Sequence, residues 1–381
     1  MAEFAAPVVE LTIEEHPNAD ALELARVGDY LSIVPKGKYK TGDLGVYIPE
    51  QAVLPERVIA RLGLEGRLAG KQKNRVKAIK LRGILSQGLI FPVETNYDVI
   101  ETGILGEPSK VKPGPSHCIR IEELGAGHVV ELGYDCAPWM GITKYEPKIP
   151  THMNGQVFNA SGYTLKFDIE NIKKYPDIIE EGEMVAITEK LHGTWACFGY
   201  HPDIEHPIVT SKGLSAQGLA FKMTEENDNN LYVRTFRYKV ERELDMLKSA
   251  HPGKPVYILG EIYGQGVQDL HYDAAEPEFR IFDIYIGTPG QGIYMDAPSV
   301  SMGWWQTDEV GVPTVPSLYV GPYSKDLLDE HTSGQTTLGE CIREGVVIRP
   351  LLERRHDDIG RVILKSVSEQ YLLRKGGTEF N

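Results

Sequence analysis

Short runs of β-branched and aromatic residues dominate the first third of the chain. Gly, Pro, Asn or Asp residues separate these runs, which occupy residues 8–15, 21–28, 30–37 and 44–51. Runs this short and rich in Val, Ile and Tyr are typical of a small antiparallel barrel rather than of alternating strands and helices. Within residues 55–64, Val58, Ile59 and Leu62 share one helical face, which predicts a short amphipathic helix.

The composition changes after this β-rich part. Residues 136–162 are rich in Pro, Gly and Asn, which indicates a linker or a long exposed connection, with a boundary close to Pro150. Beyond it, residues 183–191 form an apolar strand that leads through a turn into another β-run. We therefore expect two domains, residues 1–145 and residues 146–381, as a length of 381 residues allows at about 100 to 200 residues per domain.

The chain is acidic, with 40 Lys and Arg against 54 Asp and Glu and a formal net charge of −14. Such a protein repels polyanions as a whole, so any contact with nucleic acid depends on local basic patches. One patch is a run without acidic residues that contains Lys71, Lys73, Arg75, Lys77, Lys80 and Arg82. This run is either an edge strand protected by its charges or a strand that faces a polyanion, and we favour the second interpretation.

The cysteines indicate a reducing compartment. Cys118, Cys136, Cys197 and Cys341 form no closely spaced pair typical of a zinc knuckle or a redox couple. No stretch approaches the ~18 consecutive apolar residues of a membrane span, and the first residues lack a basic segment followed by a long apolar run. We therefore expect a cytoplasmic protein without disulfides or a membrane partner, acting as a monomer.

Candidate catalytic residues follow one another along the second domain. Lys190 ends the apolar strand and precedes His192 and Gly193, whose turn lets the backbone approach a ligand closely. Later turns and β-runs carry further charged or aromatic candidates, namely Lys212, Glu261, Phe282, Glu344 and Lys365. Each one alone is more typical of a charge at a strand end than of a ligand.

Together these residues provide the chemistry of nucleotidyl transfer. A lysine that attacks phosphorus must be neutral, and a divalent cation or a second lysine, such as Lys365, lowers its pKa. Glu344 is a candidate for the hard oxygen ligand that Mg²⁺ and Mn²⁺ prefer. Glu261 can hydrogen-bond to a ribose, and Phe282 offers a flat apolar face on which a purine can stack.

In this order, over residues 165–375, the set resembles the covalent nucleotidyltransferase superfamily of polynucleotide ligases and capping enzymes. The Lys-x-His-Gly form of the first motif, from Lys190 to Gly193, resembles the RNA-ligase branch, whereas DNA ligases and capping enzymes usually have Asp in place of His192. The resemblance implies an α+β fold: an ATP-grasp-like ligase domain with two antiparallel sheets and flanking helices.

The resemblance also implies roles for individual residues. Lys190 would become covalently adenylylated by ATP, with Glu189 and Gly193 at the nucleotide, and His192 would act on the pyrophosphate side of this step. The remaining implied contacts are with the ribose, the adenine, the metal and the α-phosphate, made by Glu261, Phe282, Glu344 and Lys365 respectively.

Two positions depart from the superfamily pattern. The second motif usually carries Ser-Arg, whereas Ser211-Lys212 replaces a two-pronged phosphate contact by a point charge, and we expect Lys212 at both ATP and RNA. The last motif usually reads Lys-x-Lys, but Ile363 occupies its first position, which leaves Lys365 with Arg361 as a candidate substitute.

The N-terminal domain carries a resemblance of its own. Residues 16–23, His-Pro-Asn-Ala-Asp-Ala-Leu-Glu, resemble the opening of tRNA-binding OB domains appended to some aminoacyl-tRNA synthetases, although the same residues can simply form a turn. An OB-like antiparallel barrel agrees with the short strands and commonly binds nucleic acid on one face. An OB module ahead of the nucleotidyltransferase domain resembles the Deinococcus-type RNA ligase group.

We therefore expect an ATP-dependent RNA ligase that joins RNA 3′-OH and 5′-phosphate ends through a lysyl-AMP intermediate and an adenylylated 5′-end. Its expected partner is RNA, in nicked duplexes or RNA/DNA hybrids. One alternative is a DNA ligase or capping-type guanylyltransferase that uses the same lysine. The other is a non-catalytic RNA-binding adaptor.

Overall fold

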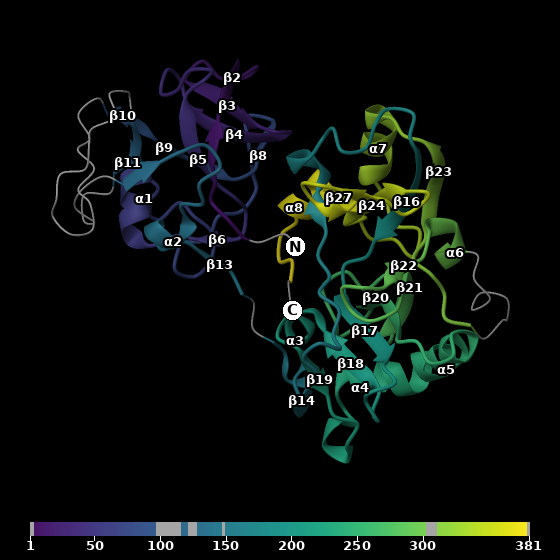
Figure 1. Ribbon diagram of the computed structural model, residues 1–381. Coiled ribbons are helices and arrows are strands. Elements are labelled where there is room, and N and C mark those ends of the chain that lie inside the picture. The colour runs from purple at the N-terminus through teal and green to yellow at the C-terminus, as the bar shows by residue number, and fades with distance from the viewer. Residues whose placement is uncertain (1–3, 97–115, 121–127, 147–148, 302–310, 379–381) are drawn as a thin grey trace. The chain divides into compact units, whose positions relative to one another are not determined.

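The computed structural model describes residues 4–96, 116–120, 128–146, 149–301 and 311–378 (Figure 1). Its contacts divide the chain into two compact units, one ending at Tyr145 and one beginning at Glu146. No helix within these described ranges is long and apolar enough to cross a membrane.

Short antiparallel strands build the N-terminal unit, as predicted. Its three three-stranded sheets are β1 (Val8–Glu10), β5 (Leu44–Ile48) and β9 (Leu89–Pro92); β2 (Thr12–Glu15), β3 (Leu22–Val27) and β4 (Tyr30–Pro35); and β10 (Glu94–Asn96), β11 (Ser116–Ile119) and β12 (His128–Val130). Buried Leu11 separates β1 from β2, so the single run predicted at residues 8–15 contributes to two sheets. In the described part of the chain the hydrogen-bonded strands are grouped into these small sheets.

The predicted helix is α1 (Glu56–Leu62), which buries Val58 and Ile59 and ends at Gly63 in the left-handed region with φ 66°. The basic stretch at residues 71–82, in contrast, is not one continuous strand. Within it only Ile79–Leu81 forms a strand, β7, which pairs with β8 (Ile84–Ser86), whereas Arg75 makes isolated bridges to Val53 and Ala69. Lys73 and Arg82 have positive φ values of 54° and 50°, which are turn conformations that a strand cannot contain.

The segment predicted as a linker is largely folded. Within residues 136–162, α2 (Ala137–Met140) is followed by β13 (Thr143–Lys144), which pairs with β6 (Ala52–Val53) in the N-terminal unit. Pro138 lies in the first turn of α2, and Gly141 ends that helix in the left-handed region. Pro and Gly therefore mark the ends of a structured element here, which is why their abundance was misleading.

Two five-stranded sheets form the centre of the C-terminal unit (Figure 1). The first sheet has the order β15 (Glu170–Asn171), β27 (Leu364–Val367), β24 (Gly345–Pro350), β16 (Met184–Lys190) and β23 (Ser317–Pro322). The second has the order β18 (Ile208–Ser211), β17 (Thr194–Tyr200), β20 (Val256–Tyr263), β21 (Glu278–Ile286) and β22 (Ile293–Tyr294). All pairs are antiparallel except β15 with β27, which agrees with the predicted pair of antiparallel sheets.

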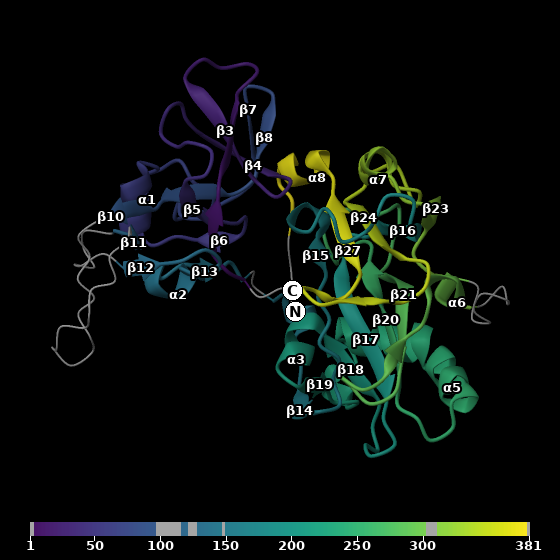
Figure 2. The ribbon, with the colours of Figure 1, turned by 45° about the horizontal axis from the view of Figure 1, so that its top comes forward.

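Helices and short pairs of strands flank these sheets (Figure 2). The helices are α3 (Lys212–Ala216), α4 (Leu231–Thr235), α5 (Glu241–Ala250), α6 (Ala297–Ser301), α7 (Lys325–Thr332) and α8 (Glu369–Leu373), with a π-helical turn η5 (Phe236–Val240) between α4 and α5. Shorter 3-10 turns are η2 (Thr151–Met153), η3 (Ile172–Lys174) and η4 (Glu225–Asn227). The additional pairs are β14 (Val157–Asn159) with β19 (Leu219–Phe221), and β25 (Arg355–His356) with β26 (Gly360–Arg361).

Each sheet buries one face against helices. In β17, Ala196 and Phe198 join a core with Tyr232 of α4 and Leu244 of α5. The alternate residues of β17, Trp195 and Cys197, belong to a different cluster on the opposite face. In the first sheet, Val185, Ile187, Val346 and Ile348 likewise pack with Leu328 of α7. The candidate site lies on the other face of each sheet, which in the second sheet also holds the cluster of Trp195 and Cys197.

Candidate nucleotidyltransferase site

Strand register places Lys190 and Lys365 on the same face of the first sheet. Lys190 pairs with Gly345, Val347 pairs with Lys365, and side chains along a strand alternate between faces. Glu344 directly precedes β24, and its carboxylate Oε1 lies 2.7 Å from Nζ of Lys190. Two predicted lysines and one predicted carboxylate thus come together from three adjacent strands.

Glu261 reaches the same place from the second sheet. It lies in β20 opposite Trp195 of β17, on the face that does not pack against α4 and α5. Burial raises the pKa of Glu261 to about 8, although the nearby Lys190 opposes this effect. The interactions of Glu261 with Lys190, Glu344 and Lys212 bring side chains from both sheets into one electrostatic cluster.

The pKa values of Lys365 and Lys190 are shifted in opposite directions. Burial, and then the charges of Lys190 and Lys212, lowers the pKa of Lys365 to about 8. Burial also acts to lower the pKa of Lys190, but Glu344 and Glu261 outweigh it, so that this pKa is raised. Without nucleotide, Lys190 is therefore an ammonium ion held by Glu344, whereas the sequence argument expected neighbours that lower its pKa.

Gly193 is required by the close approach of two strands at the first motif. A Cβ atom at this position would lie 2.1 Å from the carbonyl oxygen of Ile262 and 3.0 Å from Cγ of Glu261. The backbone N–H of Gly193 also donates to the Glu261 carboxylate and opposes the rise of its pKa. The turn after Lys190 thus packs directly on the strand that carries Glu261.

A β-bulge re-aims Phe282. Ile281 pairs with Gly260 and Asp283 pairs with Leu259, so Phe282 has no partner of its own in β20. Its half-buried ring lies 5.4 Å from the ring of Phe167, and Phe167 in turn lies 6.1 Å from Trp195. These rings line the Glu261 face of the second sheet. Phe167 was missed in the sequence because the extended segment that carries it has no distinctive pattern.

Glu189 points away from Lys190. Its buried carboxylate accepts hydrogen bonds from Oγ1 of Thr336 and from the backbone N–H and Oγ1 of Thr337, the last two at 3.0 and 2.9 Å. Neighbouring residues in a strand face opposite sides of the sheet, so only the backbone of Glu189 lies along the Lys190 face. The carboxylate is engaged in holding the 336–337 segment.

Lys212 extends the cluster at the start of α3, and Ser211 caps this helix by accepting a bond from Leu214 N–H. Nζ of Lys212 lies 3.0 Å from Oδ1 of Asp168, a carboxylate that was not predicted as a site residue. No local signal identifies Asp168, because its link to Lys212 and its electrostatic interaction with Lys365 arise only in the folded chain.

His192 is buried, and both of its ring nitrogens have protein partners. Nε2 lies 2.9 Å from Oδ1 of Asp269, and Nδ1 lies 2.8 Å from the hydroxyl of Tyr371. A contact with a leaving pyrophosphate would therefore require one of these bonds to be exchanged. His192 is two residues from Lys190 of the cluster, and both of its ring nitrogens are engaged with protein groups.

Arg361 is committed to a different set of contacts. Its guanidinium donates to Asp283 and Glu353 and lies 3.7 Å from the centre of the Tyr294 ring. Arg349 donates to the same Asp283 at 3.2 Å, which ties the first sheet to the second. This ion cluster explains the place of Arg361 in the fold, so the structure does not support Arg361 as the substitute for the missing lysine.

The residues present fit a divalent cation at Glu344. Oε1 of Glu344 bonds to Lys190, whereas Oε2 is buried without a hydrogen-bond partner among the described residues. Across the described ranges no group of three or more His, Cys, Asp or Glu side chains is arranged to hold a metal ion. Mg²⁺ retains most of its waters in such sites and needs only one or two carboxylates, so the single orphaned oxygen is compatible with it.

The basic residues of the N-terminal unit divide into two kinds. Lys71, Lys73, Lys77, Lys80 and Arg82 are exposed. Arg75 is buried, with its guanidinium 3.7 Å from the centre of the Tyr145 ring and bonded to Gln51. The packing of Arg75 within its own unit thus sets it apart from the five exposed residues of this stretch.

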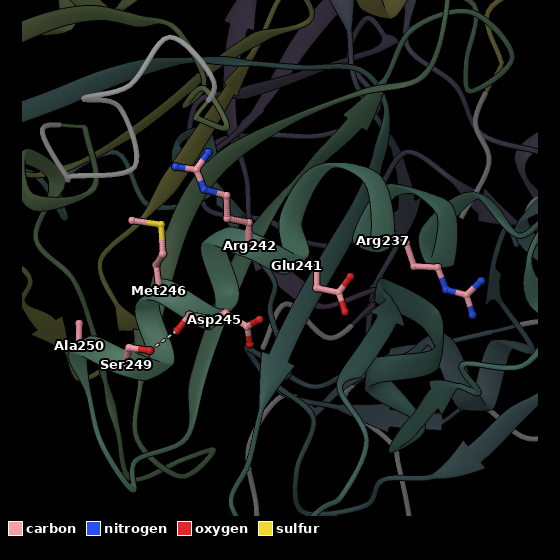
Figure 3. Close-up of a pocket in the computed structure, with 7 residues that line it drawn as sticks. All are labelled: Arg237, Glu241, Arg242, Asp245, Met246, Ser249 and Ala250. Carbon is pink, nitrogen blue, oxygen red and sulfur yellow. Dashed lines mark hydrogen bonds between the residues drawn. The ribbon is translucent and has the colours of Figure 1, made fainter.

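A surface hollow on the exposed face of α5 is not part of the site (Figure 3). Its lining residues come from α5 and the turn before it, namely Arg237, Glu241, Arg242, Asp245, Met246, Ser249 and Ala250. None of the predicted site residues lines it.

Two family models match the chain. Residues 183–367 match the family described as RNA ligase, and residues 8–93 match an OB-fold domain. The RNA ligase match includes both site lysines and both carboxylates of the cluster. No protein with a curated description matches the chain in sequence.

Solved structures of a Naegleria gruberi RNA ligase share the fold of nearly the whole chain. The ligase with PPi is 22% identical, with a TM-score of 0.73 over 97% of this chain and 98% of that chain. A mutant with AMP and Mn is 21% identical, with a TM-score of 0.71 over the same shares. This likeness confirms the α+β class and the order of an OB domain before a ligase domain. Residues 183–367 thus carry the features of the RNA ligase family, and residues 8–93 carry an OB-fold domain ahead of them.

Proposed function

We propose that Lys190 is the residue that accepts AMP, and that the enzyme seals RNA nicks in duplexes. The convergence of Lys190, Lys365, Glu261 and Glu344 from two sheets is the observation that carries the proposal. Lys190 attacks the α-phosphorus of ATP and releases pyrophosphate. The AMP then passes to an RNA 5′-phosphate, and an RNA 3′-OH displaces the AMP to form the phosphodiester.

The other residues bind and orient the nucleotide. Phe282, displaced from the strand register by its bulge, stacks on the adenine, and Glu261 bonds to the ribose hydroxyls. Burial raises the pKa of Glu261 to about 8, which brings its protonated form, able to donate as well as accept, close to neutral pH. Lys365 contacts the α-phosphate, where its positive charge stabilises the charge that develops during transfer.

Lys190 must lose its proton before it can attack. The Glu344 carboxylate opposes this loss in the structure, because it holds the ammonium group at 2.7 Å. Mg²⁺ or Mn²⁺ bound at Glu344 would supply positive charge to the polyphosphate and compete for this carboxylate. The solved Naegleria gruberi ligase structures that hold Mn with ATP or AMP agree with this assignment.

The RNA contacts belong to both units in this proposal. In the ligase domain, Lys166 and Arg355 line a hollow that has no acidic lining residue. Lys166 lies two residues before Asp168, the partner of Lys212. In the OB domain, the exposed lysines around β7 provide a second basic surface, and the wide minor groove of A-form RNA displays the 2′-hydroxyls that such surfaces can contact.

Sealing of four nicked duplexes by the full chain, present as a monomer, tests this substrate assignment. The nicks combine an RNA or DNA 3′-OH strand with an RNA or DNA complement, and ATP is compared with GTP. We expect sealing with ATP wherever the 3′-OH strand is RNA. Equal sealing of DNA 3′-OH strands would indicate a DNA ligase, and nucleotide use restricted to GTP would indicate capping chemistry.

A further inference from the structure

His192 is held from two elements that are distant in sequence. Asp269 lies in the loop after β20, and Tyr371 lies in α8 near the end of the described chain. Their side chains meet Nε2 and Nδ1 of the imidazole at 2.9 and 2.8 Å. The His192 side chain is only 6% exposed, so water does not replace these partners.

Asp269 is itself fixed by the C-terminal segment. Oδ2 accepts from Nε of Arg374 at 2.9 Å, and Oδ1 accepts from the backbone N–H of Thr378 at 2.7 Å. Oγ1 of Thr378 also lies 3.0 Å from Oδ1 of Asp269 and 2.9 Å from Oε1 of Gln268. Gln268 donates to the carbonyl oxygen of Gly193 at 3.1 Å, so the segment 371–378 reaches both His192 and the turn after Lys190.

These bonds hold the ring at both nitrogens. The Asp269 carboxylate and Nη2 of Arg374 meet Nε2 at 2.9 and 3.2 Å, and the Tyr371 hydroxyl meets Nδ1 at 2.8 Å. A carboxylate behind an imidazole fixes the tautomer and orientation of the ring in other enzymes, and loss of such a partner impairs function even when the fold is intact.

We infer that Asp269 and Tyr371, supported by Arg374, are positioning residues for His192 in the first nucleotidyl transfer. The inference rests on the proposed function, because it assigns these residues to the step that forms lysyl-AMP. They act through His192 and the 191–193 turn and do not touch the nucleotide. The C-terminal segment thereby completes a site whose nucleophile lies more than one hundred and eighty residues earlier in the chain.

The three-step scheme separates this role from a general structural one. Lysyl-AMP formation and its reversal by pyrophosphate both require His192 in place, whereas sealing of an RNA whose 5′-end is already adenylylated bypasses that step. We expect Asp269→Asn to slow lysyl-AMP formation by about 10- to 100-fold and to leave single-turnover sealing of the adenylylated RNA within about threefold of wild type. Tyr371→Phe, which removes only one hydroxyl, should act in the same direction more weakly.

Asp273→Asn is the matched control, since Asp273 lies in the same loop and its carboxylate accepts from the backbone N–H of Glu340 at 3.1 Å. It should leave both steps unchanged. In a His192→Ala background, Asp269→Asn should cause no further loss of the residual labelling, because residues that act through one another are not additive.

Three outcomes for Asp269→Asn would overturn the inference. The variant could form lysyl-AMP as fast as wild type, or it could lose lysyl-AMP formation and sealing of adenylylated RNA to the same extent. In the double variant with His192→Ala, it could add its full loss of labelling to that of His192→Ala. If Asp269→Asn proves unfolded by thermal melting, the same comparison is made with Tyr371→Phe, and equal loss of both steps there also overturns it. Failure of the proposed function itself is distinct, because the wild-type protein would then form no lysyl-AMP.

Discussion

Lys190 and Lys365 have the same side chain but opposite electrostatic settings. Lys190 faces the carboxylates of Glu344 and Glu261, which keep it charged despite its burial. Lys365 lies beside two other lysines, and burial together with their charge lowers its pKa to about 8. The proposed reaction requires the reverse distribution of protons, a neutral Lys190 and a charged Lys365. The active protonation state is therefore a minor one, and its population depends on pH.

The pH dependence of labelling follows from these two groups. The second-order rate constant for lysyl-AMP formation, which reports the free enzyme, should rise about tenfold per pH unit as Lys190 loses its proton. Above about pH 8 it should level off, because Lys365 loses its charge there. In Lys365→Arg the guanidinium stays charged, so the rise should continue to pH 9.5. The same levelling in both proteins would show that Lys365 is not the group involved.

Site residues could be predicted where their place along the chain followed a known pattern. Lys190, Glu344 and Lys365 could be identified because each stands at a β-run and their order along the chain resembles the superfamily pattern. The register that brings Lys190 and Lys365 to one face appears only in the folded chain. Side chains alternate between the faces of a strand, so the Glu189 side chain points away from the Lys190 face. The family resemblance placed Glu189 and its backbone at the nucleotide. Asp168 and Asp269 could not be found, because their partners lie 44 and 77 residues away and meet them only in the folded chain.

At the scale of elements, a buried ion cluster connects the two sheets across the site. Asp283 of β21 is fully buried and accepts from Arg349 of β24 and from Arg361 of β26. Asp283 directly follows Phe282, so the cluster also fixes the bulge that turns Phe282 toward the site. The strands could be predicted from their apolar runs, but this connection could not, since it depends on how the two sheets face each other.

Removal of Asp283 should therefore weaken the fold more than removal of an outer carboxylate. Asp283→Ala leaves the guanidinium groups of Arg349 and Arg361 with Glu353 as their remaining carboxylate partner, and we expect a loss of about 3 kcal/mol in the free energy of unfolding. Glu183→Gln is the control. It removes an ion pair with Arg354 that is partly exposed and should cost about 1 kcal/mol or less. Denaturant unfolding measures both values, and equal losses would contradict the structural role of the cluster.

The control pair also has a predictable pH dependence. The hydrogen bond from Arg354 holds the pKa of Glu183 below its usual range. A lowered pKa stabilises the folded state above the unfolded value of about 4.5, and this contribution is lost as the pH falls through the lower folded value. The stability difference between wild type and Glu183→Gln should accordingly be full at pH 7 and disappear in acid.

At the scale of the whole molecule, an acidic protein must bind a polyanion. The net charge of −14 makes approach unfavourable unless local basic surfaces compensate for it. The exposed residues at 71–82 are one such surface, although they are presented by turns and a short two-stranded arm rather than by one strand. ATP, a small anion bound in the ligase domain, does not need this surface.

Charge reversal in the OB domain should therefore impair the steps that bind RNA and leave lysyl-AMP formation unchanged. Lys71→Glu combined with Lys77→Glu should raise the KM for nicked RNA by about tenfold and lower the salt dependence of binding by about one unit per lost phosphate contact. Lysyl-AMP formation should not change. The matched control, Lys36→Glu with Lys40→Glu, alters the same charge at exposed sites elsewhere in the domain. Equal effects of the two pairs would exclude a specific RNA surface at residues 71–82.

The most direct test of the central claim is covalent labelling of the protein by ATP that carries a labelled α-phosphate. Wild type and Lys190→Ala are incubated with the nucleotide and Mg²⁺ or Mn²⁺ and then separated under denaturing conditions, with Lys212→Ala as a lysine-loss control. We expect label that survives denaturation in wild type and in Lys212→Ala, and none in Lys190→Ala. Stable label retained in Lys190→Ala would show that another residue accepts AMP and would contradict the assignment of the site.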